Sequence, residues 1–449
     1  MTAPRHIKLF LFPAAAGAHV AGWRHPEARN NLLDFEADRR TAQIAEAAGF
    51  DALFFADRLS FPVRGNATAE RSAGSAVLEP LTLLAALSTV TRHIGLVATS
   101  STSYHEPFHV ARIFASLDHL SHGRAGWNLV TSLTDAEAAN FGREAHFEHS
   151  ARYRRAEEFV DVVKGLWDSV EDSAFIRDKH SGRFLDLDQV HALNHQGEHF
   201  RVQGPLNVPR PPQGHPLLVQ AGSSEEGLRL AARVADVVFT TQQELAPAQD
   251  FYRALKARVV GAGRAADQQL IMPGLSAVVG RTRKEAEDKL QALNELIDID
   301  VAVAFLSALS GGTDLSRYPL DGPLPDLALT NGNRSKQALF LRQAREHNLS
   351  IRQLAIQVAG SGGHRVITGT AQDVADDLQR WFESGAADGF NFKPLYLDDN
   401  LRDFADQVLP ILRERGLFKH DYAPGTLREK LGLQRPANRF RAVAPGGAA

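Results

Sequence analysis

Short apolar segments alternate with amphipathic, helix-like segments along most of this chain. Eight such strand-and-helix units of one polarity can be counted, which predicts a parallel sheet with right-handed crossovers. We therefore expect an α/β fold, a (β/α)8 TIM barrel with insertions and a C-terminal helical extension. A doubly wound open sheet is the alternative, but no dinucleotide fingerprint follows the first strand. The expected strands are residues 7–12, 52–56, 94–98, 125–131, 217–221, 237–240, 270–280 and 389–395.

The length of 449 residues exceeds that of an ordinary domain but suits a barrel with insertions. We expect one barrel domain over residues 1–420, with insertions at about 172–215 and 294–361 where the alternating pattern is lost. Residues 421–449 form a basic tail containing proline and glycine, which either lies on a partner subunit or is loose.

Composition excludes several classes of function. The chain has no cysteine, so disulfides, thiolate metal sites and a cysteine nucleophile are ruled out. The formal net charge of −3 gives no sign of a nucleic-acid partner. No uncharged apolar run reaches the roughly 18 residues of a membrane span, and Lys8 interrupts the N-terminal apolar run. We expect a soluble, cytoplasmic protein.

Polar side chains gather where the predicted strands end, although buried parallel strands are usually apolar throughout. The carboxyl ends of barrel strands carry the active site in this fold. The candidates are Asp57 after the second strand, Thr99–Ser103 after the third, Asn128 and Thr131 on the fourth, and Gly222-Ser223-Ser224 after the fifth. Which of Thr99, Ser101 and Ser103 would contact a ligand stays open.

The sequence Gly222-Ser223-Ser224 stands where a helix begins. Free N–H groups and the helix dipole bind an anion such as phosphate there, and glycine allows its close approach. The alternative is that one of the serines only caps the helix. His149 and Tyr153 are four residues apart at the head of another helix and share one face. They are either phosphate-binding donors or an ordinary surface pair.

A metal site is not expected. His191, His195 and His199 recur every four residues, a spacing that aligns ligands on a helix. Gly197 and the loop-like composition around it argue against a helix in this region. No metalloprotease, hydrolase or phosphate-loop motif occurs elsewhere.

Several stretches carry a family resemblance. They include GFDALFFAD (49–57), IGLVATSSTSYHEPFHVARIFASLDHLSHGRAGWNLVTS (94–132), RYRRAEEFVDVVKGLWDS (152–169) and QAGSSEEGLRLAARVADVVFT (220–240). With these, the chain resembles the flavin-dependent monooxygenases of the bacterial luciferase-like family. It is most similar to the subgroup of nitrilotriacetate, dibenzothiophene-sulfone and long-chain alkane monooxygenases. The resemblance covers about residues 5–420 and is strongest before residue 245.

The resemblance implies a barrel that holds reduced FMN. Asp57 and Thr99 would lie by the flavin ring and ribityl chain, and Asn128 and Thr131 would line the same cleft. Substrate contacts are expected in residues 294–361, where the match is weakest. His19 and His25, after the first strand, are candidates for a substrate-side or catalytic role, or are polar loop residues. The ribityl–phosphate end would be held by His149, Tyr153, Gly222, Ser223 and Ser224.

The resemblance also implies a reaction. Reduced FMN and O₂ would form a C4a-(hydro)peroxyflavin that oxygenates a small organic substrate, whose class, a sulfur, nitrogen or alkane compound, stays open. Because the chain lacks a convincing nicotinamide fingerprint, an NAD(P)H:flavin reductase would supply the flavin. A homodimer or homotetramer is expected. The alternatives are a deazaflavin-dependent oxidoreductase of the same superfamily and a flavin-binding protein without turnover.

Overall fold

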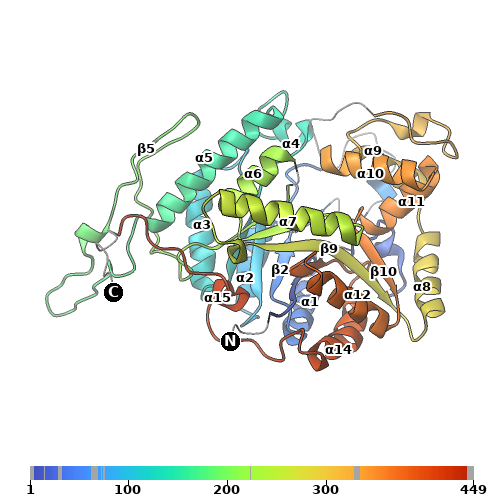
Figure 1. The fold of residues 1–449 in the computed structure, drawn as a ribbon. Helices are drawn as coiled ribbons and strands as arrows, with labels where there is room; N and C mark the ends of the chain where they lie inside the picture. The colour runs from blue at the N-terminus through green and yellow to red at the C-terminus, as the bar shows by residue number, and fades with distance from the viewer. Residues whose placement is uncertain are drawn as a thin grey trace.

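The computed structural model describes residues 5–14, 16–28, 33–61, 69–71, 73, 76–222, 224–327 and 334–441. Eight parallel strands close into a barrel in the order β1-β2-β3-β4-β7-β8-β9-β11, and β11 pairs with β1 (Figure 1). The predicted TIM barrel is therefore confirmed, and the open sheet is excluded. The barrel strands are β1 (Lys8–Leu11), β2 (Ala52–Phe55), β3 (Gly95–Ser101), β4 (Ala125–Val130), β7 (Leu217–Gln220), β8 (Val237–Thr240), β9 (Leu270–Val279) and β11 (Gly389–Phe392).

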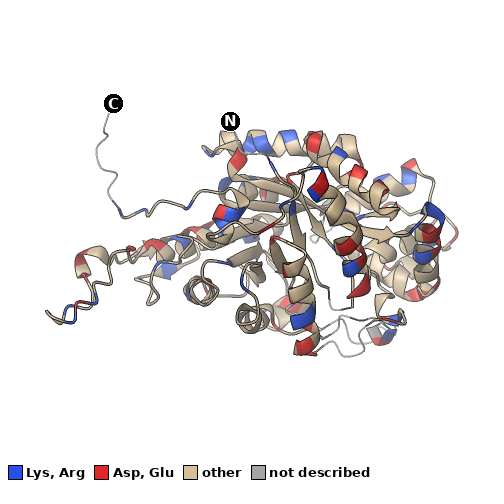
Figure 2. Cartoon of the chain, turned by 90° about the horizontal axis from the view of Figure 1, so that it is seen from below, with Lys and Arg blue, Asp and Glu red and all other residues tan. Residues whose placement is uncertain are grey.

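Helices surround the barrel and bury their apolar faces against it (Figure 1). Local signals set their starts: Asp34 caps the first helix, and Pro80 and Pro107 occupy first-turn positions. In Figure 2, charges of both signs mix along the outer helices, in keeping with the small net charge. The surrounding helices are α1 (Phe35–Ala47), α2 (Pro80–Ser88), α3 (Pro107–Leu120), α4 (Asp135–Ala139), α5 (His149–Asp168), α6 (Glu225–Val234), α7 (Leu245–Gly261), α8 (Arg283–Glu295), α12 (Ala371–Glu383), α13 (Asp399–Asp403) and α14 (Leu409–Glu414).

Side chains alternate between the barrel interior and the helix layer, as the pleat of a strand requires. On β4, Trp127 and Leu129 pack in the apolar layer beneath the helices. The indole N–H of Trp127 donates to the Ser100 carbonyl at 3.0 Å, which satisfies its one polar group. Phe10, Phe54 and seven further buried side chains of the strands fill the interior: Ala52, Val97, Leu217, Val219, Val237, Leu270 and Met272.

The C-terminal segment closes the N-terminal end of the barrel. Leu427, Leu431 and Leu433, on and just after α15 (Leu427–Leu431), belong to the interior apolar cluster. A Cβ atom on Gly95, at the start of β3, would lie 2.7 Å from the Leu427 side chain, so only glycine leaves room for it. The buried Arg428 forms an ion pair with Asp236. Residues 421–441 therefore pack on the barrel of their own chain. Neither placement expected for the tail, on a partner subunit or loose, describes this packing.

A further strand, β10 (Arg365–Gly369), was not predicted. The first part of β9 pairs with β8, whereas its second part, from Leu275 to Val279, pairs with β10 outside the barrel. Strand β9 is thus shared between the barrel and an added edge. Four of the five residues of β10 are only half-buried and the fifth, Gly369, is buried, so the segment lacks the apolar run that identified the barrel strands.

Two segments stand apart from the barrel. Residues 172–215 extend as an arm with a two-stranded antiparallel pair, β5 (His195–Gln196) and β6 (Arg201–Val202), at the left of Figure 1. On this arm His191 and His195 pair with glutamates, and no group of residues suited to a metal ion occurs among the described residues. The second segment contributes α9 (Ile299–Leu309), α10 (Arg334–Glu346) and α11 (Ile351–Ser361), which share their own apolar cluster.

None of the helices in the described part of the chain is long and apolar enough to cross a membrane. The arm exposes large apolar side chains, among them Phe184 at 61% and Leu187 at 75%. Such a surface suits association with another chain. The expected homo-oligomer nevertheless stays a prediction.

Helix α15 and Leu433 form a plug in the N-terminal end of the barrel, and truncating the Leu427 side chain in this barrel plug should destabilise the protein. Leu427→Ala removes a fully buried side chain from a closed interior, so the free energy of unfolding should fall by about 2–5 kcal/mol. Urea-induced unfolding measures this change. The control is Leu187→Ala, which should change it by no more than about 0.5 kcal/mol. Equal stabilities of the two variants would contradict a sealing role for α15.

Candidate functional site

The buried polar groups at the N-terminal end of the barrel are largely hydrogen-bonded, although Gln269 Oε1 has no partner in the described structure. At the N-terminal end Gln213 donates to Asp118 at 2.6 Å, and Arg428 pairs with Asp236. At the C-terminal end Asn128 Oδ1 and Asn391 Oδ1 are buried without a hydrogen-bond partner in the described structure. Buried polar atoms without partners are uncommon and need an explanation. They identify the C-terminal mouth as the candidate site, as expected for this fold.

Three phenylalanines form the floor of this mouth. The rings of Phe12, Phe54 and Phe239 pack together with centroid distances of 5.3, 6.2 and 5.8 Å. His364, on the loop that leads into β10, stacks on Phe239 at 5.2 Å. A Cβ atom on Gly274 would lie 2.5 Å from the His364 ring, so the glycine on β9 makes this stacking feasible. The floor is therefore apolar, and a flat ring could lie against it.

The wall made by β3 and β4 carries an amide. Asn128 and Thr99 are neighbours in the strand register, and Asn128 Nδ2 donates to Thr99 Oγ1 at 2.8 Å. Thr99 Oγ1 in turn donates to the Phe55 carbonyl at 2.8 Å. Asn128 thus points to the interior, opposite to Trp127, as the alternation of side chains along a strand requires. Its Oδ1 atom remains available to a ligand.

The other hydroxyl groups near this wall join the two strands to each other. Ser101 Oγ lies 2.9 Å from Ser132 Oγ, and Ser103 Oγ donates to the Thr131 carbonyl at 2.7 Å. Thr99 is therefore the hydroxyl residue that adjoins Asn128. Contact of Thr99, Ser101 or Ser103 with a flavin, and of Thr131 with the cleft, stays a prediction.

Asp57 follows β2 and is half-buried. One carboxylate oxygen accepts the Arg58 N–H at 2.8 Å. Burial raises the pKa of Asp57 above its ordinary value, and the negative charges of Glu79 and Glu137 raise it further. A carboxyl with a raised pKa at the end of a barrel strand is typical of functional sites.

The beginning of α6 is the candidate anion site. Ser224 caps the helix, since its Oγ atom accepts the Gly227 N–H at 3.1 Å. The Tyr153 hydroxyl lies over the same turn, because Cβ atoms on Gly222 and Gly227 would lie 3.3 and 3.2 Å from it. The helix cap and the anion site were posed as alternatives, and this geometry accommodates both. Ser223 lies outside the described residues.

His149 and Tyr153 lie together on the same face of α5, with ring centroids 5.0 Å apart. Both are buried, at 5% and 7% exposure, so they are not an ordinary surface pair. His149 Nδ1 is 3.5 Å from a carboxylate oxygen of Glu226 in the first turn of α6. The pair therefore joins α5 to the candidate anion site.

The contacts of His19 and His25 favour positioning roles. His19 Nδ1 accepts the Ala21 N–H at 3.1 Å, so Nε2 carries the proton and donates to Asn294 Oδ1 at 3.1 Å. Burial lowers the pKa of His19 to about 4, which keeps the ring neutral. The His25 ring stacks on Tyr396 at 3.9 Å. A catalytic role for either histidine stays a prediction that these contacts do not support.

Sequence reasoning missed Asn391, His364 and Lys393, which the structure brings to the mouth. A signal was present for two of them, because Asn391 and Lys393 alternate within the predicted strand 389–395. Polar residues at alternate positions of a buried parallel strand point into the barrel. His364 carried no comparable signal, since a loop outside the barrel pattern places it.

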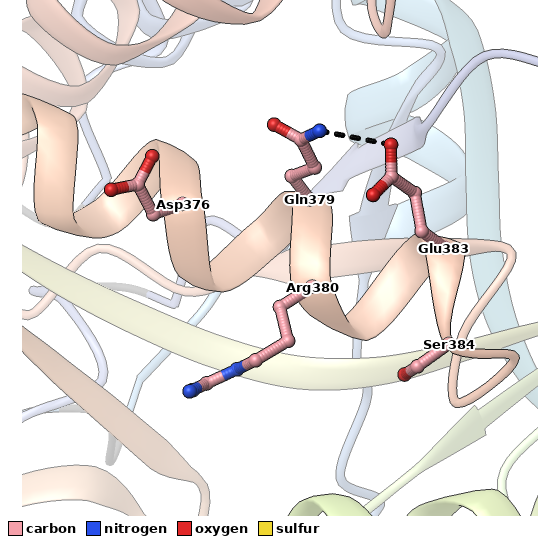
Figure 3. A pocket seen from close by; sticks show the side chains of 5 residues that line it. All are labelled: Asp376, Gln379, Arg380, Glu383 and Ser384. Atoms are coloured by element: carbon pink, nitrogen blue, oxygen red, sulfur yellow. Dashed lines mark hydrogen bonds between the residues drawn. The ribbon is translucent and has the colours of Figure 1, made fainter.

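A hollow on the outer surface is unrelated to this mouth. Figure 3 shows that it lies along α12, a helix of the outer layer. Gln379 there donates to Glu383 at 2.9 Å, within a group of solvated side chains. Its lining residues are Asp376, Gln379, Arg380, Glu383 and Ser384.

Comparison with known proteins identifies the family. Residues 12–388 match the family described as Luciferase-like monooxygenase. The chain belongs to this family. This luciferase-like chain is 48% identical to N-acetyl-S-(2-succino)cysteine monooxygenase of Bacillus subtilis (strain 168), covering 97% of this chain and 98% of the relative. It is 46% identical to nitrilotriacetate monooxygenase component A of Aminobacter aminovorans, with 98% and 99% covered.

A solved structure supports the same placement. The crystal structure of a riboflavin lyase with modified FMN and riboflavin is similar with a TM-score of 0.88 and 34% identity, over 96% of this chain and 97% of that one. The predicted membership of the luciferase-like family is confirmed, as is the expectation of an enzyme of the monooxygenase type.

The stability of the protein should depend on pH through His19. Between pH 6.5 and about 4 the unfolded chain binds a proton at His19 that the folded protein excludes. This residue should therefore lower the free energy of unfolding by up to about 1.4 kcal/mol for each pH unit lost. Urea unfolding at pH 7 and pH 4.5 should show a smaller pH dependence for His19→Gln than for the parent. The control is the exposed His180→Gln, and identical behaviour of both variants would contradict the assignment.

Proposed function

We propose that this chain is the oxygenase component of a two-component monooxygenase, which uses reduced FMN and O₂ to oxygenate a small organic compound. The observation that carries the proposal is the pairing, at one mouth, of an anion site at α6 with a buried, unpartnered Asn128 Oδ1. A flavin mononucleotide presents a phosphate at one end and ring N–H and C=O groups at the other. The aromatic floor between these sites suits its flat ring.

The residues present therefore fit the cofactor. The N-terminus of α6, with Ser224 and the Tyr153 hydroxyl, would hold the phosphate, and His149 would support the adjoining ribityl chain. Asn128 Oδ1 would accept a ring N–H, while its Nδ2 atom remains bonded to Thr99. Bound reduced flavin supplies the activation of O₂ and the transfer of an oxygen atom. The protein's part is to orient the ring and, through Phe12, Phe54 and Phe239, to exclude water beneath it.

A separate NAD(P)H:flavin reductase would supply the reduced flavin. Two observations support this: the chain has no convincing nicotinamide fingerprint, and one relative is named as component A of its monooxygenase. The deciding experiment measures substrate-dependent NADH consumption with a generic flavin reductase, across sulfones, aminocarboxylates and alkanes. Thermal protection by reduced FMN, but not by a reduced deazaflavin, would exclude the deazaflavin alternative. Flavin binding without oxygenated product for any compound would favour the non-catalytic alternative.

The anion site can be tested through one hydroxyl group. Tyr153→Phe keeps the buried ring and removes the group that lies over the first turn of α6. Loss of a hydrogen bond to a charged phosphate should weaken reduced-FMN binding by about 10-fold or more. Anaerobic fluorescence titration measures the affinity, and the exposed Tyr318→Phe is the matched control. An unchanged affinity in Tyr153→Phe would remove this hydroxyl from the phosphate site.

The proposed contact with the flavin ring can be tested at Asn128. Asn128→Leu keeps the approximate volume; it loses the Nδ2 hydrogen bond to Thr99, worth about 1 kcal/mol, but also removes the buried Oδ1 atom that has no protein partner. The melting temperature of the protein without flavin should therefore stay nearly unchanged, whereas reduced-FMN affinity or the coupling of oxygen use to product should fall. A large loss of stability with normal flavin binding would instead make Asn128 a structural residue.

A further inference from the structure

Lys393 is a buried lysine on the side of the mouth opposite Asn128. It directly follows β11, and the strand order places β11 across the barrel from β4. Strand β9 holds its backbone: the Lys393 N–H donates to the Leu275 carbonyl at 2.8 Å, and the Lys393 carbonyl accepts from Ser276 Oγ at 2.6 Å. The ammonium group lies 4.7 Å from the centre of the Phe12 ring, over the aromatic floor.

This ammonium group has no counter-charge in the described structure. Only 9% of Lys393 is exposed, and it makes no hydrogen bond or ion pair with a described residue. The charged and titratable groups that act on it are Lys336, on α10, and its neighbour His364, and no carboxylate is among them. Burial and the repulsion of Lys336 lower the pKa of Lys393 to about 7. An uncompensated buried cation is costly, which makes it typical of functional sites.

The loop Ser361–His364 brings further donors to the same place. Lys336 Nζ donates to the Gly362 carbonyl at 3.0 Å, and a Cβ atom on Gly362 would lie 3.7 Å from Lys393 Nζ. Both ammonium groups thus lie beside one residue, whose φ of 62° favours glycine. His364 is buried, and its Nδ1 atom has no partner among the described residues. Gln243 holds the loop by donating to the Gly363 carbonyl at 2.7 Å.

We propose that Lys393, with Lys336 and His364 beside it, binds a carboxylate group of the substrate. The inference rests on the proposed function and names the substrate class of that same mouth. The flavin phosphate does not suit this position, because its site at α6 follows β7 on another part of the barrel rim. A carboxylate supplies the missing counter-charge, whereas a neutral sulfone or an alkane would leave it missing. The structure therefore favours a carboxylic acid as substrate over neutral compounds.

The test compares acid and ester forms of one compound on matched variants. Nitrilotriacetate and its trimethyl ester serve as probes, with binding measured by calorimetry in the presence of reduced FMN under anaerobic conditions. Lys393→Met should weaken nitrilotriacetate binding by roughly 10- to 100-fold and leave the ester unchanged. Lys179→Met, an exposed lysine on the arm, is the control and should change neither. The melting temperature of Lys393→Met should not fall, because the variant removes an uncompensated buried charge.

Proton uptake on ligand binding gives a second, independent test of the carboxylate site. At pH 8 the Lys393 side chain is mostly neutral in the free protein, since its pKa is about 7. Binding of a carboxylate favours the charged form, so nitrilotriacetate should take up a proton on binding. Calorimetry in two buffers of different ionisation enthalpy measures this uptake. It should fall in Lys393→Met, where Lys336, whose pKa burial lowers to about 8, remains to take up part of a proton, and it should be retained in full in Lys179→Met.

The outcomes separate this proposal from the function on which it rests. Loss of reduced-FMN affinity in Lys393→Met, equal effects on acid and ester, or no effect on either would overturn the carboxylate site. So would binding of the ester or of dibenzothiophene sulfone in preference to the acid. In each of these cases a parent protein that still binds reduced FMN and oxygenates some compound keeps the proposed function. A parent protein that does not bind reduced FMN would overturn both.

Discussion

Closure of the barrel imposes one constraint on everything else, because half of every strand's side chains must be accommodated inside a narrow ring. Phe10, Val97 and their neighbours fill the middle, and Leu427 with the residues after it seals the N-terminal end. The seal depends on Gly95 and on the buried pair of Arg428 and Asp236. With the interior and one end filled, the C-terminal mouth is the place where inward-facing polar groups can meet a ligand.

Different parts of the fold supply the different polar groups of the C-terminal mouth. The wall of β3 and β4 and the start of α6 offer hydrogen-bond groups suited to a flavin, and they come from the repeating strand-and-helix units. The opposite wall offers cationic groups, and these come from β11 and from the added helices that end in the Ser361–His364 loop. Under the proposed function, the first wall would hold the cofactor and the second would contact the substrate.

The sequence was a good guide to the barrel and a partial guide to the site. All eight barrel strands were predicted near their observed positions, because apolar runs between helices carry a strong periodic signal. Alternation separates Asn128 from Trp127, and the cost of burying an unpaired amide among apolar side chains places Asn128 inward. Three other features could not be predicted, because each depends on contacts between segments far apart in the chain. They are the strand β10, the barrel plug at Leu427 and the position of His364. Lys393 lies inside a predicted strand that is mostly apolar, and no functional role was predicted for it.

The barrel plug also has a consequence for how the chain is made. Strand β1 pairs with β11, and the leucines that seal the barrel lie beyond residue 426, so the last part of the chain completes the structure of the first. A ribosome that has released only the first seven strands has produced an open sheet with two unpaired edges and an unfilled end. Such a nascent chain is a target for chaperones until its C-terminus emerges. Truncation of the chain before Leu427 would therefore harm the whole barrel.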